Sequence, residues 1–149
     1  MLKRIQAGMI AGILLTSYAT VPQVPPPQAP PPLDVVRAKF DAVHRHDLAA
    51  IVAAYAPDAH LMASDFCAPR NGRDAVERTY TALLAIEDLN VSVDEAIADG
   101  NRVLMRIRVR GAFKGQRFEI PIANYFEVRA GLIAYDLGVF NNGTRPCQQ

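Results

Sequence analysis

The stretch Arg102–Phe113, RVLMRIRVRGAF, alternates between apolar and basic side chains over most of its length. The apolar row is Val103, Met105, Ile107 and Val109, and the basic row is Arg106, Arg108 and Arg110. Because successive side chains of a strand point to opposite faces of a sheet, this pattern predicts a strand with one buried face. We interpret the basic row as a sheet surface that faces solvent or a second copy of the chain.

The alternation continues on both sides of this strand. Asp99-Gly100-Asn101 precedes it as a hairpin signal, and turns at Lys114-Gly115 and Arg129-Ala130-Gly131 follow it. These turns separate further strands that we predict over residues 91–97, 118–128 and 132–141. Four consecutive strands joined by short turns predict an antiparallel meander.

The N-terminal half of the chain has a helical period instead. We predict a first helix from Leu33, with Asp34 at its start, a short second helix capped by Asp47, and a third over residues 73–86. A turn at Pro57-Asp58, a short strand over residues 59–64 and a loop over 65–72 separate the last two helices. Helices followed by a meander predict an α+β domain with its helices on one face of a curved sheet.

The chain begins with an export-like segment. Lys3 and Arg4 precede an apolar run, and Ser17-Tyr18-Ala19 is a cleavage pattern, so residues 1–19 are predicted to be a signal peptide. The proline-rich residues 20–32 predict an extended linker, and residues 33–149 form the domain. We therefore expect an exported protein, periplasmic or secreted. An uncleaved signal would instead tether it through transient membrane contact.

Composition and motifs exclude several classes of function. Without Lys3 and Arg4 the 16 basic residues fall to 14 against 15 acidic ones, so there is no basic excess for nucleic acid. His44 and His46 point to different sides of a helix and His60 is isolated, so no metal site is expected. No phosphate loop or dinucleotide fingerprint is present, and no cofactor is expected.

The chain has two cysteines, Cys67 and Cys147. In an oxidising compartment an even number of cysteines indicates one disulfide, which would tie the C-terminal tail to a central loop. Two unrelated thiols are an equally good interpretation, because spacing alone does not establish the geometry of a disulfide.

Three polar side chains, two within predicted strands and one just after a strand, are candidate catalytic or ligand-binding residues. Asn124 is the single polar residue of an inward row, so it either holds the core together or faces a pocket. Asp65 follows the short strand and would be a base at a cavity rim, or a loop carboxylate that caps a turn. Asp136 alternates with the more apolar row of Ile133 to Val139, which favours an outward position where it could pair with the arginines, but the sequence alone leaves its orientation undecided.

Three segments resemble a known superfamily. The run DLAAIVAAYAPDA (residues 47–59) resembles the second helix of the nuclear-transport-factor-2-like superfamily, which includes SnoaL-like polyketide cyclases, limonene epoxide hydrolase and ketosteroid isomerase. PRNGRDAVERTY (69–80) and PIANYF (121–126) resemble a loop with the third helix and a pocket strand of ketosteroid isomerase. The resemblance covers residues 33–140. It implies a cone of three helices against a curved antiparallel sheet, with an apolar pocket and often a dimer.

Few of the catalytic residues of ketosteroid isomerase have a counterpart of the same type in this chain. It places the isomerase's base on Ala63 and its oxyanion tyrosine on Lys39, or on Phe40 after a slip of one residue. The isomerase's protonated aspartate falls on Asn124, and only a supporting tyrosine is kept, as Tyr80. The resemblance therefore implies an isomerase-like shape without the usual isomerase acid and base.

The catalytic residues of limonene epoxide hydrolase and of the polyketide cyclases are matched to other positions of this chain. The resemblance to limonene epoxide hydrolase places that enzyme's arginine on Arg106 and replaces its two aspartates by Arg108 and Gly138. The resemblance to the polyketide cyclases turns Asp136 and Phe140 inward, which conflicts with the outward orientation predicted from the apolar row.

Three functions follow from this sequence. The first is an exported pocket domain that binds a small apolar molecule. The second is a ketosteroid isomerase-like or polyketide cyclase-like enzyme acting on a ketone, with Asp65 or Asp136 as base, so enzymatic activity stays open. The third is a homodimeric association module. The expected ligand-binding residues are Phe40, Tyr55, Tyr80, Asn124, Phe126 and Phe140.

Overall fold

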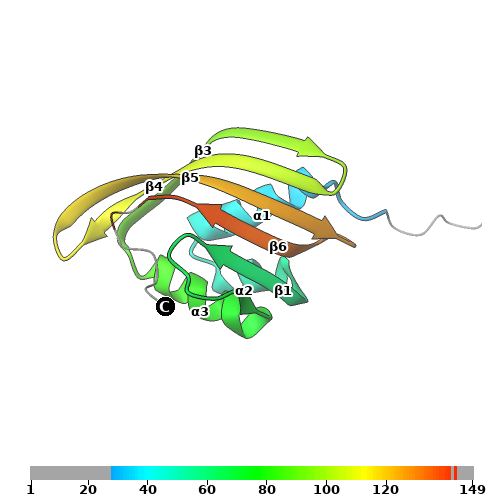
Figure 1. Cartoon of the computed structure of the whole chain (residues 1–149), viewed down its shortest axis with the longest axis horizontal. Helices are drawn as coiled ribbons and strands as arrows, with labels where there is room; N and C mark the ends of the chain where they lie inside the picture. Colours follow the sequence, from blue (N-terminus) through cyan, green and yellow to red (C-terminus); the bar gives the residue numbers. More distant parts are fainter. Residues whose placement is uncertain (1–27, 142, 144–149) are drawn as a thin grey trace, which may run out of the picture.

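The computed structural model describes residues 28–141 and 143 (Figure 1). The predicted signal peptide, most of the predicted linker and Cys147 lie outside the described residues. Export, the tether and the pairing of Cys67 with Cys147 therefore stay predictions. None of the helices in the described ranges is long and apolar enough to cross a membrane.

Three helices and six strands make up the domain. The helices are α1 (Pro32–His44), α2 (Leu48–Ala53) and α3 (Arg73–Leu84). The strands are β1 (Tyr55–Ala63), β2 (Arg70–Asn71), β3 (Glu87–Asp99), β4 (Arg102–Phe113), β5 (Gln116–Arg129) and β6 (Leu132–Val139). Pro32 occupies the first turn of α1, where a backbone donor is not needed, and the Asp47 side chain caps α2 by accepting from the Ala50 amide at 3.0 Å.

The six strands form one sheet in the order β2-β1-β6-β5-β4-β3. Neighbouring strands are antiparallel except β1 and β6, which are parallel. The sheet curves, and the helices lie on one side of it (Figure 1). The prediction of an α+β cone with three helices on a curved sheet is confirmed, although the sheet is only mostly antiparallel.

The start of β1 departs from the prediction. The strand begins at Tyr55 and runs through Pro57-Asp58, where the sequence predicts a turn. Tyr55 pairs with Ile133 whereas His60 pairs with Tyr135, so a bulge absorbs the extra residues of β1. The turn prediction is wrong because a bulge accommodates a proline that a regular ladder would not.

The alternating rows of the meander sit as predicted on β4 and β5. Val103 and Met105 are buried beneath the sheet, and Asn124 and Phe126 are buried on the same face of β5. On β6 Asp136 is only 7% exposed and points inward, as the family resemblance implied and contrary to the position that the apolar row favoured. Counting apolar residues misleads there because the outer face of this sheet also carries apolar side chains.

Candidate functional site

A cavity of about 420 Å³ lies between the helices and the concave face of the sheet. Its wall is mainly apolar and comes from both layers. Representative lining residues are Phe40 of α1, Leu83 of α3, Leu61 of β1, Val91 of β3, Ile107 of β4 and Ile122 of β5. The cavity exists because both inward faces are apolar and the curved sheet holds them apart.

One end of the cavity is polar and is organised by Asp136. The Oδ2 atom of Asp136 accepts hydrogen bonds from the hydroxyls of Tyr55 at 2.5 Å and Tyr80 at 3.3 Å. The Oδ1 atom accepts from the Asn124 amide nitrogen at 3.1 Å. The two tyrosine hydroxyls lie 2.7 Å apart. Hydrogen bonds to a charged acceptor are the stronger ones, so this buried carboxylate is well compensated.

Lys39 is the remaining charged group of this polar end, and it comes from α1. Its side chain is 3% exposed, and Nζ lies 4.0 Å from Asp136 Oδ2. The ammonium also faces aromatic rings, with Nζ 3.9 Å from the ring centre of Phe40 and 5.0 Å from those of Tyr80 and Phe126. Lys39, Tyr80, Asn124 and Asp136 all line the cavity.

Burial changes the proton affinities of this polar end. Loss of hydration lowers the pKa of Lys39 to about 8, and the nearby charge of Asp136 offsets only part of that effect. Burial, followed by the negative charge of Asp136, raises the pKa of both Tyr55 and Tyr80 well above the usual value. The tyrosines therefore remain neutral donors, while Lys39 exchanges its proton around pH 8.

Six of the predicted site residues line the cavity. They are Phe40, Asp65, Tyr80, Asn124, Asp136 and Phe140. Asp65 is exposed and lies in the turn after β1, whereas Asp136 is buried at the polar end, so the two candidate bases occupy different parts of the cavity.

Tyr55 and Phe126, which were also expected to bind the ligand, are not among the residues that line this cavity. Both are fully buried. Tyr55 lies behind Tyr80 and Asp136, to which it is hydrogen-bonded, and Phe126 packs edge-on against Phe40 with ring centres 6.0 Å apart. Phe126 shares a face with Asn124, but the core closes over that end of the strand.

Lys39 was not predicted as a site residue, although the sequence contains a signal. Val35, Val36, Phe40 and Val43 are buried on α1, and Lys39 occupies a position within the same stripe. A charged side chain at a core position of an amphipathic helix is rarely buried without a partner. The partner here is on β6, which helix periodicity does not reveal.

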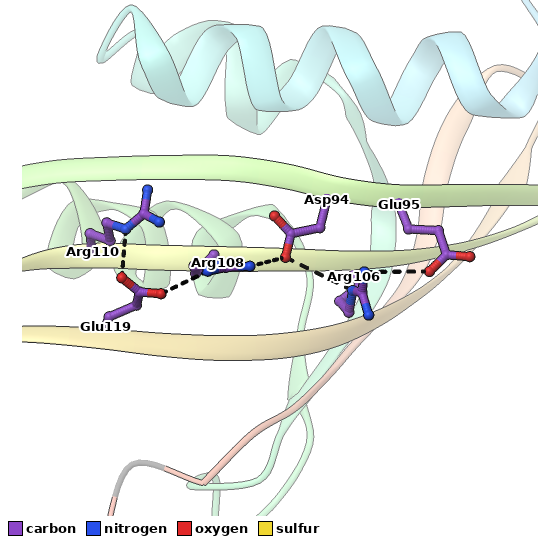
Figure 2. Close-up of polar contacts among 6 residues, drawn as sticks. All are labelled: Asp94, Glu95, Arg106, Arg108, Arg110 and Glu119. Atoms are coloured by element: carbon purple, nitrogen blue, oxygen red, sulfur yellow. Dashed lines mark hydrogen bonds and ion pairs between the residues drawn. The ribbon is translucent and has the colours of Figure 1, made fainter.

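The arginines of β4 lie on the opposite face of the sheet from the cavity. Figure 2 shows Arg106, Arg108 and Arg110 interleaved with acidic residues of β3 and β5. Arg108 binds Asp94 at 2.8 Å and Glu119 at 3.0 Å. Because Asp136 faces inward, it does not pair with this row.

The exposure of Arg106 bears on the resemblance to limonene epoxide hydrolase. Arg106 is exposed and contacts Asp94 and Glu95 at 3.9 and 3.8 Å, so it does not occupy the place of a pocket arginine that the epoxide hydrolase resemblance implied. Exposed ion pairs of this kind contribute little to stability, because water and salt screen the charges. Within the described residues, no group of three or more His, Cys, Asp or Glu side chains is placed to hold a metal ion.

The fold and cavity define a cone-shaped α+β pocket domain with one polar end. The family model of the SnoaL-like domain matches residues 36–135. The chain belongs to the SnoaL-like family. None of the curated proteins matches the chain significantly.

Solved structures agree with this fold. A putative polyketide cyclase from Sinorhizobium meliloti is 28% identical, with a TM-score of 0.61 over 70% of this chain and 93% of that one. A hypothetical protein from Catenulispora acidiphila with a ketosteroid isomerase-like fold, in complex with trimethylamine, is 22% identical, with a TM-score of 0.64 over 74% and 85%. An epoxide hydrolase of M. tuberculosis resembling limonene epoxide hydrolase is 20% identical, with a TM-score of 0.65 over 73% and 81%.

The lowered pKa of Lys39 predicts a specific pH dependence of stability. Between pH 8 and 10.5 the unfolded chain binds a proton at Lys39 that the folded chain has released, so the free energy of unfolding rises with pH. Relative to Lys39→Met, the unmodified protein should gain about 2 kcal/mol between pH 8 and 10, measured by urea denaturation. Lys114→Met, at an exposed lysine, is the matched control. A difference between the protein and Lys39→Met that does not change with pH would contradict the assignment.

Proposed function

We propose that this SnoaL-like domain binds a small, mostly apolar molecule that carries one oxygen group. The observation that carries this proposal is a cavity of about 420 Å³ with apolar walls and polar side chains gathered at one end. Apolar walls supply affinity through burial, at about 25 cal/mol for each Å² removed from water. A few convergent polar groups fix the orientation of such a ligand.

The polar end supports an oxygen-bearing ligand in particular. Asn124 Oδ1 is buried and has no hydrogen-bond partner among the described residues, because the amide nitrogen is directed at Asp136. A buried acceptor without a partner costs about 1–3 kcal/mol, and a ligand hydroxyl would satisfy it. The Lys39 ammonium is the donor that a carbonyl oxygen would need, because the single hydroxyl proton of Tyr80 already goes to Asp136.

The positions matched to the isomerase's catalytic residues also favour binding. The resemblance puts the base on Ala63 and the oxyanion tyrosine on Lys39 or Phe40, and all three residues line the cavity. Among the relatives, the C. acidiphila protein was solved with a small organic molecule, trimethylamine. This is consistent with a family whose pockets accept small ligands.

A matched ligand series tests the proposal. Cuminyl alcohol and 4-isopropylacetophenone should bind about tenfold more tightly than the hydrocarbon p-cymene, because a buried hydrogen bond contributes about 1.4 kcal/mol. Calorimetry and thermal shift measure this, and androstane with its alcohol and ketone extends the series to larger ligands.

Variants at the polar end sharpen the same experiment. Asn124→Leu should remove the advantage of the alcohol over the hydrocarbon, and Lys39→Met should weaken that of the ketone. Tyr55→Phe is the control, since Tyr55 contacts Asp136 from outside the cavity. Absence of binding for every member of the series, or equal binding of hydrocarbon and alcohol, would refute the proposal.

A second candidate function is proton transfer at a ketone, as in an isomerase or cyclase. The observation that favours it is the inward position of Asp136, a carboxylate at the floor of the cavity. Both oxygens of Asp136 already accept hydrogen bonds, which weakens it as a base relative to an unpartnered carboxylate. The S. meliloti relative, a putative polyketide cyclase, is consistent with this chemistry.

Hydrogen–deuterium exchange next to the carbonyl of 4-isopropylacetophenone distinguishes catalysis from binding. If Asp136 is the base, Asp136→Asn should lower the exchange rate at least a hundredfold, consistent with the usual contribution of a general base. Asp65→Asn tests the alternative base at the rim in the same NMR assay. Exchange no faster than in buffer, or rates unaffected by both substitutions, would exclude this function.

We also propose that the outer face of the sheet mediates a homodimer. Ile97, Leu104, Tyr125 and Leu137 are cross-strand neighbours in one row over β3, β4, β5 and β6. Ile97 is 55% and Leu104 is 51% exposed. The row lies beside the arginine–carboxylate pairs, and apolar surface framed by charged residues is typical of interfaces.

Light scattering tests the dimer. The domain should have twice the mass of one chain, and Leu104→Glu should produce monomers because it places a charge in the centre of the apolar row. Phe113→Ser is the matched control, since Phe113 is exposed at the end of β4 outside the row. A monomeric protein at all concentrations would contradict the proposal, and so would a dimer that Leu104→Glu leaves intact.

A further inference from the structure

Lys39 has the surroundings of a reactive amine. Its Nζ lies in the cavity and, among the described residues, it has no hydrogen-bond partner, since the Asp136 carboxylate is 4.0 Å away. The rings of Phe40, Tyr80 and Phe126 surround the nitrogen and keep its side chain in place. Among the described residues, the Lys39 nitrogen therefore has one charged neighbour, Asp136, and that neighbour lies beyond hydrogen-bond distance.

We propose that Lys39 captures an aldehyde or ketone in the cavity as a reversible Schiff base. This inference rests on the proposed function, because it requires the carbonyl compound to bind in the same cavity. It assigns Lys39 a covalent role and narrows the ligand class from oxygen-bearing molecules to aldehydes and ketones.

Burial favours the neutral amine that such a reaction needs. Removing an ammonium from water costs several kcal/mol, whereas a cation–π contact returns about 2 kcal/mol when desolvated, so the aromatic rings compensate only partly. With a pKa of about 8, about half of the Lys39 side chains are neutral at pH 8. An ordinary lysine with a pKa of 10.5 is neutral in about one molecule in three hundred at that pH.

The neighbouring groups suit both steps of imine formation. The Nζ lone pair attacks the carbonyl carbon, the C=O π electrons move to oxygen, and a proton passes from nitrogen to oxygen to give a carbinolamine. With one further proton the hydroxyl leaves as water and the nitrogen lone pair forms the C=N bond. Asp136 is the nearest carboxylate to carry these protons, and Asn124 Oδ1 accepts a hydrogen bond from the carbinolamine hydroxyl.

The chain provides its own internal control. Its lysines are Lys3, Lys39 and Lys114, and Lys114 is exposed. A carbonyl reagent that reacts by accessibility alone prefers an exposed lysine over one that is 3% exposed. Selective reaction at Lys39 therefore reports on the cavity rather than on general amine chemistry.

Reductive trapping tests the inference. The full chain is incubated at pH 8 with cuminaldehyde and then with sodium cyanoborohydride, and peptides are mapped by mass spectrometry. The reduced adduct adds the mass of the aldehyde less one oxygen atom. We expect labelling of Lys39 at least tenfold faster than of Lys114, and loss of this preference in urea, where the cavity no longer exists.

Two controls separate this inference from the proposed function. Lys39→Arg should abolish the fast labelling while keeping a cation in the cavity, and excess cuminyl alcohol should protect Lys39. If Lys39 reacts no faster than Lys114 although cuminyl alcohol binds, the Schiff base is refuted and the binding function stands. If cuminyl alcohol does not bind either, both are refuted. Fast labelling that the alcohol does not suppress would also overturn the inference, because the reaction would then lie outside the cavity.

Discussion

The buried carboxylate of Asp136 is the contact on which the polar end of this domain depends. Through it, β6 is joined to β1 by Tyr55, to α3 by Tyr80, to β5 by Asn124 and to α1 by Lys39. Removing one partner of a buried charge pair destabilises a protein by about 3–5 kcal/mol, because the other charge is left without compensation. The same carboxylate therefore holds layers of the fold together and keeps a cation in an apolar cavity.

Much of the fold was predictable because it depends on local patterns. The alternation of residues 102–113 corresponds to the bounds of β4, and the inward row of β5 is buried as expected. The failures have a common physical cause. Pro57-Asp58 forms a bulge rather than a turn because pairing with β6 extends the strand, and pairing between distant segments leaves no local trace.

The candidate site was predicted less well than the fold. Asn124 and Asp136 stood out as polar residues of predicted strands, and Tyr80 was named through the family resemblance. The sequence does not single out Lys39, because its role depends on a carboxylate that only the tertiary structure brings near. The orientation of Asp136 was missed because β6 has apolar side chains on both faces, so hydrophobicity does not distinguish them.

The pairing of Tyr55 with Asp136 spans 81 residues of chain. It brings together the start of the first long strand and the last strand, and closing such a long loop is slow compared with forming the hairpins of the meander. During synthesis, Lys39 emerges well before its carboxylate partner. Lys39 therefore meets its carboxylate only where β6 pairs with β1, so neither half of the chain contains the polar end of the cavity by itself.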